Sequence, residues 1–127
     1  MPTLASISTI AFPFKIDQQE VKQYAKDLFS PSYPQMEKML VAFDNTEIIT
    51  RNFCKPLTYY TELHTFEDQN LEYIRTSLEY AVKAIEECLL SALRLKEEIT
   101  DIIFVSTTGL STPSLDALII NNSSFAS

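Results

Sequence analysis

The sequence predicts an α/β fold in which helices connect strands by right-handed crossovers. Residues 102–105 read Ile-Ile-Phe-Val, a continuous apolar run rich in β-branched residues, which is typical of a strand buried on both faces. A long amphipathic pattern over about residues 70–95 precedes this run and predicts a crossover helix. Pro113 follows the run and favours a further helix, because its fixed φ suits a first helical turn.

The first part of the chain predicts one strand and two helices. Residues 4–14 alternate between apolar and small polar side chains, which indicates a strand closed by a proline. Asp17 followed by Glu20 resembles a capping box and predicts the start of a helix, which serines and prolines then end. A second, shorter helix is expected over about residues 35–43, where apolar residues recur at core spacing.

The long helix over about residues 70–95 is predicted from one apolar stripe, with Asp68 as the candidate N-cap. The same period could form a coiled-coil seam, but a crossover helix that feeds the strand at residues 102–105 explains it without a partner. The stripe consists of Leu71, Ile74, Leu78, Ala81, Ile85, Cys88 and Ala92.

A polar loop separates the predicted strand from the last helix. Residues 106–109 read Ser-Thr-Thr-Gly and contain the only glycine in the chain. Such a strand-to-loop edge is where α/β sheets place groups that face a ligand. The helix that follows is expected to be capped by Thr112 or Ser111, with its apolar stripe formed by Leu115, Leu118 and Ile119.

The composition is that of a single globular unit at most. The chain has 127 residues, of which 46% are hydrophobic and 21% charged, enough for a modest core. The net charge of -7 argues against nucleic acid as a general partner, because phosphate binding needs a basic surface. Cys54 and Cys88 form neither a disulfide framework nor a metal-ligand spacing, so a reducing, cytoplasmic location is expected. The N-terminus has no basic residue before Lys15, which is typical of neither a signal peptide nor a membrane span.

Residues 101–119 carry a resemblance to a known family. They read DIIFVSTTGLSTPSLDALI and resemble a segment of the type III polyketide synthases, the chalcone and stilbene synthase family, where a buried strand ends in a Thr-Thr or Thr-Ser-Gly loop before a proline-started helix. The resemblance extends over about residues 5–121, because a long helix and an N-terminal strand precede this segment in the same order. It implies the N-terminal fragment of a thiolase-like αβαβα fold, roughly the first third of an enzyme.

The resemblance also divides the chain. Residues 1–121 are expected to be a truncated segment of the family, and residues 122–127 a polar tail outside it. A frame change or premature stop near Asn121 would produce such a tail, and a natural flexible terminus is the alternative.

The resemblance implies roles for five residues. Arg51 and Lys55 would contact the phosphates of coenzyme A. Thr107 and Thr108 would line the cavity that holds the growing polyketide. Thr112, just before the proline, matches a residue that reaches across the dimer interface into the partner's cavity.

The family's chemistry needs residues that this chain lacks. These homodimeric enzymes load an acyl group from coenzyme A onto a cysteine, decarboxylate malonyl-CoA and extend the acyl chain by Claisen condensation. A histidine and an asparagine late in the chain stabilise the developing negative charge. Cys54, Cys88 and His64 do not match this set. No catalytic residue, metal or bound cofactor is therefore expected, with Cys88 buried in a helix and His64 solvated.

Three hypotheses for function follow. In the first, the chain is an N-terminal fragment of a type III polyketide synthase and is inactive alone. In the second, it is a non-catalytic module that keeps the coenzyme A or dimer surface and modulates a complete enzyme. In the third, it does not fold stably, because the strand at residues 102–105 would need sheet neighbours that the chain lacks.

Overall fold

The computed structural model describes residues 1–123, which form parts of two compact units. The first unit contains residues 11–63. The second contains residues 1–10 and 64–123.

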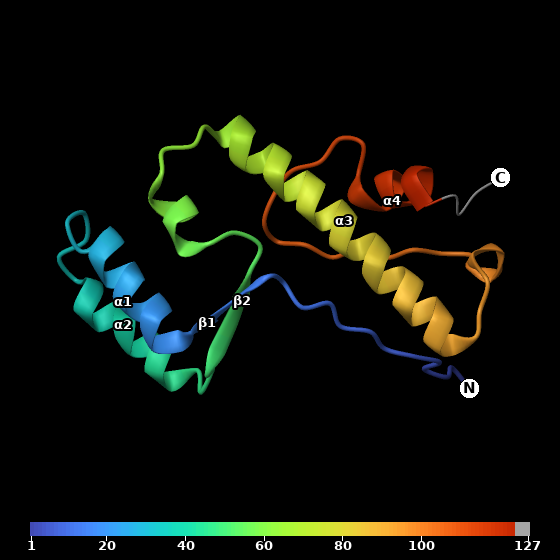
Figure 1. The fold of residues 1–127 in the computed structure, drawn as a ribbon, viewed down its shortest axis with the longest axis horizontal. Coiled ribbons are helices and arrows are strands. Elements are labelled where there is room, and N and C mark those ends of the chain that lie inside the picture. Colours follow the sequence, from blue (N-terminus) through green and yellow to red (C-terminus); the bar gives the residue numbers. More distant parts are fainter. Residues whose placement is uncertain (124–127) are drawn as a thin grey trace. The chain divides into compact units, whose positions relative to one another are not determined.

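The unit of residues 11–63 joins a two-stranded sheet to a pair of helices (Figure 1). Strand β1 pairs with β2 in antiparallel register, so that Phe14 lies opposite Phe53 and Asp17 lies opposite Thr50. The elements follow one another as β1 (Phe14–Asp17), α1 (Gln18–Phe29), α2 (Met36–Asn45), β2 (Thr50–Phe53) and the 3-10 helix η1 (Leu57–Thr61).

Both helices predicted for this region are present. The carboxylate of Asp17 accepts a hydrogen bond from the backbone N–H of Gln19 at 2.8 Å and so caps α1. The helices pack through Val21 of α1 and Met36 and Leu40 of α2, whose side chains are buried. These apolar residues form the core of the unit.

The second unit is organised around α3 (Phe66–Ala92). Thr65 caps this helix through a reciprocal capping box, in which the Thr65 hydroxyl accepts from the Asp68 N–H at 3.1 Å and the Asp68 carboxylate accepts from the Thr65 N–H at 3.2 Å. The predicted start near residue 70 was therefore too late, and Asp68 lies inside the first turn instead of at the N-cap. The 3-10 helix η2 (Lys96–Glu98) follows α3.

The N-terminal segment runs along α3 instead of forming the predicted strand. The Ser6 hydroxyl donates to the Cys88 carbonyl at 2.7 Å, and the Ser8 hydroxyl donates to the Ala84 carbonyl at 2.6 Å. The prediction of a strand over residues 4–14 was wrong, because regular pairing begins only at Phe14, where β2 supplies a partner. Side-chain hydroxyls bonded to helix carbonyls hold the earlier residues.

Residues 102–105 also form no strand, contrary to the sequence prediction. The side chains of Ile103 and Val105 are 89% and 83% exposed, whereas Ile102 and Phe104 are half-buried. This alternation is the pattern of an extended chain with one covered face. A strand needs a hydrogen-bonded neighbour, and the two strands among residues 1–123 pair with each other in the first unit.

The last described element is α4 (Leu115–Ser123), which packs against α3 (Figure 1). Leu115 and Ile119 are buried, with Ile119 only 1% exposed, as the predicted stripe requires. The Ser114 carbonyl accepts the first helical bond, from the Leu118 N–H at 3.0 Å. The N-cap is therefore Ser114 and not the predicted Thr112 or Ser111.

Two further points concern the ends and surfaces of the chain. Of the predicted tail, residues 122 and 123 lie in α4, while residues 124–127 lie outside the described residues. None of the helices formed by residues 1–123 combines the length and the apolar character needed to cross a bilayer.

Candidate functional site

The predicted site residues fall in both units. Arg51 and Lys55 belong to the unit of residues 11–63, while Thr107, Thr108 and Thr112 belong to the unit built on α3. The first two residues form a cationic region, and the threonines lie on or next to a hydroxyl-bearing loop.

Arg51 is held on β2 by two contacts. Its Nε donates to Gln18 Oε1 at 2.7 Å, and its guanidinium carbon lies 5.8 Å from the centre of the Phe43 ring. The side chain is half-buried. These contacts fix the plane of the guanidinium. Its terminal N–H groups form a fork that can donate two parallel hydrogen bonds to the oxygens of a phosphate.

Gln18, which the sequence did not single out, organises this region. It is 3% exposed and its amide nitrogen donates to the Phe43 carbonyl at 3.1 Å and to the Thr46 hydroxyl at 3.3 Å. Its amide oxygen accepts from Arg51. A buried glutamine with both ends bonded orients the arginine, because leaving either end unpaired would be costly.

Lys55 lies beyond the end of β2 among aromatic rings. Its ammonium is 5.6 Å from the centre of the Tyr59 ring, a cation–π distance. Tyr60 packs against Tyr59, and its hydroxyl oxygen lies 3.7 Å from the Cys54 sulfur. Burial, together with the hydrogen bond and charge of Cys54, raises the pKa of Tyr60 above its usual range. The phenol therefore stays protonated beside Lys55.

Thr107 and Thr108 are exposed on a loop that α3 supports. The Tyr73 hydroxyl donates to the Ser106 hydroxyl at 2.8 Å, and the Thr108 N–H donates to the same Ser106 oxygen at 3.3 Å. The glycine of the loop, Gly109, lies against the Tyr73 ring, where a Cβ atom would come within 2.5 Å of ring carbons.

The far end of this loop is bonded to Asn70. The Asn70 amide nitrogen donates to the Leu110 carbonyl at 2.8 Å, and its oxygen accepts from the Leu110 N–H at 2.8 Å. Asn70 and Tyr73 were missed as site residues. Asparagine is a poor residue for a helix interior, because its side chain competes for backbone groups, and this was the available signal.

The remaining candidate residues, Thr112, His64 and Cys88, belong to the unit built on α3. Thr112 is exposed ahead of Pro113, and His64 is half-buried one residue before the cap of α3. Cys88 lies on α3 with its sulfur 2.9 Å from the Ser6 hydroxyl. Among residues 1–123, no three His, Cys, Asp or Glu side chains lie close enough to hold a metal ion.

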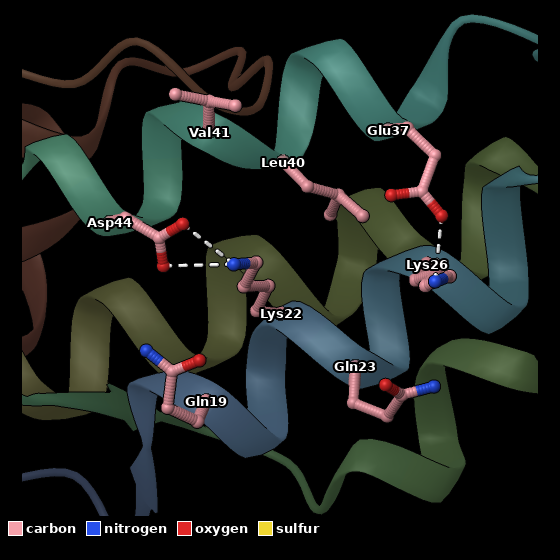
Figure 2. A pocket seen from close by; sticks show the side chains of 8 residues that line it. All are labelled: Gln19, Lys22, Gln23, Lys26, Glu37, Leu40, Val41 and Asp44. Carbon is pink, nitrogen blue, oxygen red and sulfur yellow. Dashed lines mark hydrogen bonds and ion pairs between the residues drawn. The ribbon is translucent and has the colours of Figure 1, made fainter.

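A polar groove of about 390 Å³ separates α1 from α2 (Figure 2). Lys22 contacts both carboxylate oxygens of Asp44, at 2.8 and 2.7 Å, and Lys26 contacts Glu37 at 2.7 Å. Each cation of α1 is thus neutralised by a carboxylate of α2. The ion pairs across the groove join the two helices. Because both lysines are paired, the groove is not suited to binding an anion. It is lined by Gln19, Lys22, Gln23, Lys26, Glu37, Leu40, Val41 and Asp44.

Comparison with known proteins finds relatives of this chain. No family model matches the sequence. A Bacillus subtilis protein named chalcone synthase is 33% identical over 131 residues, which cover 99% of this chain and 36% of that protein. The 1,3,6,8-tetrahydroxynaphthalene synthase of Streptomyces coelicolor is 32% identical over 127 residues, which cover 100% of this chain and 34% of the enzyme.

A solved structure agrees with these relatives. The crystal structure of the Streptomyces coelicolor 1,3,6,8-tetrahydroxynaphthalene synthase, described as a bacterial type III polyketide synthase, matches 96% of this chain with a TM-score of 0.80. The chain is homologous to the type III polyketide synthases. It spans about a third of the length of the relatives that it matches, 36% and 34% for the first two.

The homology confirms the predicted fold class, an α/β fragment of the thiolase-like fold of type III polyketide synthases. The chain matches the solved synthase over nearly all of its own length, but the match covers only 34% of the synthase chain.

Proposed function

We propose that this chain supplies a coenzyme A contact and a wall of the polyketide cavity to the type III polyketide synthase fold, and that it transfers no acyl group by itself. The observation that carries the proposal is homology over 99% of the chain to a third of such a protein. The substrates would be acyl-CoA and malonyl-CoA, and the working assembly would be a homodimer with Thr112 at its interface. Residues 1–121 would be the family segment.

Arg51 and Lys55 are the proposed phosphate contacts. Both are half-buried cations in an acidic chain, and both have an aromatic ring within cation–π distance. Gln18 fixes the Arg51 fork in advance, so binding a phosphate would cost little side-chain entropy. Such a pair would recognise the diphosphate of coenzyme A by charge and by geometry.

Titration of coenzyme A into the purified chain tests this role. We expect Arg51→Lys, which keeps the charge and loses the fork, and Lys55→Gln each to weaken binding roughly threefold to tenfold. Lys38→Gln on the exposed side of α2 is the matched loss of charge and should leave the affinity unchanged. Equal affinities in all four proteins would contradict the phosphate role.

Thr107 and Thr108 are the proposed cavity residues. Their hydroxyls are exposed on a supported loop and could donate hydrogen bonds to the carbonyl oxygens of a β-ketoacyl thioester. The small diketide acetoacetyl-N-acetylcysteamine tests this role without the nucleotide. We expect it to shift the backbone amide NMR signals of Ser106 and Leu110 in the same loop, and Thr107→Val with Thr108→Val to abolish these shifts.

Inactivity of the isolated chain follows from its side chains. Claisen condensation on an enzyme needs a thiolate and donors aimed at the developing oxyanion. Cys88 is engaged by Ser6, and Cys54 lies beside the protonated phenol of Tyr60. We expect no polyketide from the chain with acetyl-CoA and malonyl-CoA. Product that disappears in Cys54→Ala or Cys88→Ala would overturn this expectation.

A further inference from the structure

Two polar side chains of α3 contact the loop that carries Thr107 and Thr108. Asn70 and Tyr73 are three residues apart on the helix and therefore share one face. Asn70 bonds both backbone groups of Leu110, and Tyr73 bonds the Ser106 hydroxyl. The two ends of the loop are thus attached to one rigid element.

The Asn70 contact imitates a strand partner. One amide group supplies an acceptor at 2.8 Å to the Leu110 N–H and a donor at 2.8 Å to the Leu110 carbonyl. This pairing constrains distance and direction at the same time, as paired backbone groups do in a sheet. The backbone of Leu110 therefore has little freedom to move away from α3.

The Tyr73 contact fixes the start and the middle of the loop. Its hydroxyl donates to Ser106 Oγ, which in turn accepts from the Thr108 N–H at 3.3 Å. The ring of Tyr73 packs under Gly109, where no larger residue has space. Because Thr107 lies between these fixed points, its backbone position follows from the position of α3.

We propose that Asn70 and Tyr73 are positioning residues that set the Thr107 and Thr108 hydroxyls for a β-ketoacyl thioester. The consequence for ligand binding rests on the proposed function, whereas the restraint of the loop does not. Hydroxyls on an unrestrained loop would lose orientation when a ligand arrives, and small displacements weaken hydrogen bonds strongly. The specificity of this cavity wall would then depend on helix side chains that do not contact the ligand.

Amide hydrogen exchange measured by NMR on the full chain tests the restraint. Asn70→Ala removes the acceptor of the Leu110 N–H, and we expect that amide to exchange at least tenfold faster. Asn70→Asp keeps an acceptor and should restore most of the protection. Gln69→Ala, one residue earlier on α3, is the matched control and should leave the Leu110 rate unchanged.

The same set of proteins separates restraint from unfolding. Alanine favours helix more than asparagine does, so the helix content measured by circular dichroism should not fall in Asn70→Ala. Tyr73→Phe keeps the ring under Gly109 and loses only the hydroxyl, and should accelerate exchange at Thr108 while sparing Leu110. Equal Leu110 rates in the wild type and in Asn70→Ala would overturn the proposal.

Titration with acetoacetyl-N-acetylcysteamine separates this proposal from the proposed function. Weaker binding in Asn70→Ala that Asn70→Asp restores would support positioning, because these side chains contact the loop and not the ligand. No binding by the wild type would count against the cavity role of Thr107 and Thr108. The exchange rates at Leu110 would still decide whether Asn70 restrains the loop.

Discussion

The aromatic ring of Tyr73 lies directly against the backbone of Gly109. A Cβ atom at residue 109 would be 2.5 Å from Cγ and Cε1 of that ring and closer still to Cδ1. The single glycine of the chain is thus explained by close approach, and not by an unusual backbone angle.

Gly109→Ala should destabilise the unit built on α3 by about 1–3 kcal/mol, because the added methyl group overlaps a ring that Ser106 also holds. Urea unfolding monitored by circular dichroism measures the change. In a Tyr73→Ala background the same substitution should cost much less, as a double-mutant cycle would reveal. An undiminished cost in that background would place the clash elsewhere.

Leu40→Ala should be among the most damaging substitutions in residues 11–63. Leu40 is 3% exposed between α1 and α2, so its truncation leaves a cavity and costs about 2–5 kcal/mol. Val41→Ala changes the neighbouring residue, which is 51% exposed, and should cost little. Thermal unfolding of the two variants makes the comparison, and similar melting temperatures would contradict the packing described.

Thr65→Ala should weaken the start of α3 by about 1 kcal/mol, because it removes the side chain that caps the helix. Thr58→Ala, at an exposed residue of η1, is the matched control. Amide exchange of the first turn should increase in the cap variant alone. Unchanged exchange there would mean that Asp68 holds the turn without Thr65.

The ion pairs between α1 and α2 should make this unit less stable in acid. The hydrogen bond and charge of Lys26 hold the pKa of Glu37 below its ordinary 4.5, and the hydrogen bond from Lys22 holds the pKa of Asp44 below its ordinary 3.8. The unfolded chain therefore takes up protons first as the pH falls. The stabilisation is complete above the ordinary values and is lost as the pH drops through the lowered ones.

Urea midpoints measured between about pH 6 and about pH 3 should follow this loss. The slope should be small and should shrink in high salt, since these side chains are exposed and screened. Glu37→Gln combined with Asp44→Asn should reduce the dependence of the urea midpoint on pH. If the double variant keeps the pH dependence of the wild type, other carboxylates cause the acid sensitivity.

The helices could be predicted because their signals are local. Caps such as Asp17 and the apolar periods of α1, α2 and α3 depend on residues close in sequence. The misplaced start of α3 has a local cause too. Asp68 and Thr65 are both acceptable caps, and the reciprocal bond between them places threonine at the N-cap.

The strands were predicted less well, because a strand depends on its neighbour. Residues 102–105 have the composition of a buried strand, yet Ile103 and Val105 remain exposed and find no pairing partner among residues 1–123. The pairing of β1 with β2 joins residues 14–17 to residues 50–53, and no residue spacing in the sequence predicts this pairing. Pairing at such a distance needs tertiary information.

The candidate site divides in the same way. Arg51, Lys55 and the three threonines Thr107, Thr108 and Thr112 were identified through resemblance to a family, and their roles stay proposals. Gln18 and Tyr73 gave no functional signal, and Asn70 gave only that of an asparagine inside a helix, because each acts through a partner at least 33 residues away. Sequence alone shows the residue that carries a hydroxyl or charge more readily than the residue that orients it.

Ser6 and Ser8 fix the position of the N-terminal segment along α3. The two-residue step from Ser6 to Ser8 advances about 6.6 Å in an extended chain, and the four-residue step from Ala84 to Cys88 rises about 6 Å along the helix. These two distances are nearly equal, so the Ser6 and Ser8 hydroxyls can each donate to a helix carbonyl at the same time. A slip of one residue would turn Ile7 toward those carbonyls and leave them without donors. The two serine hydroxyls thus determine where along the helix the segment lies and in which direction it runs.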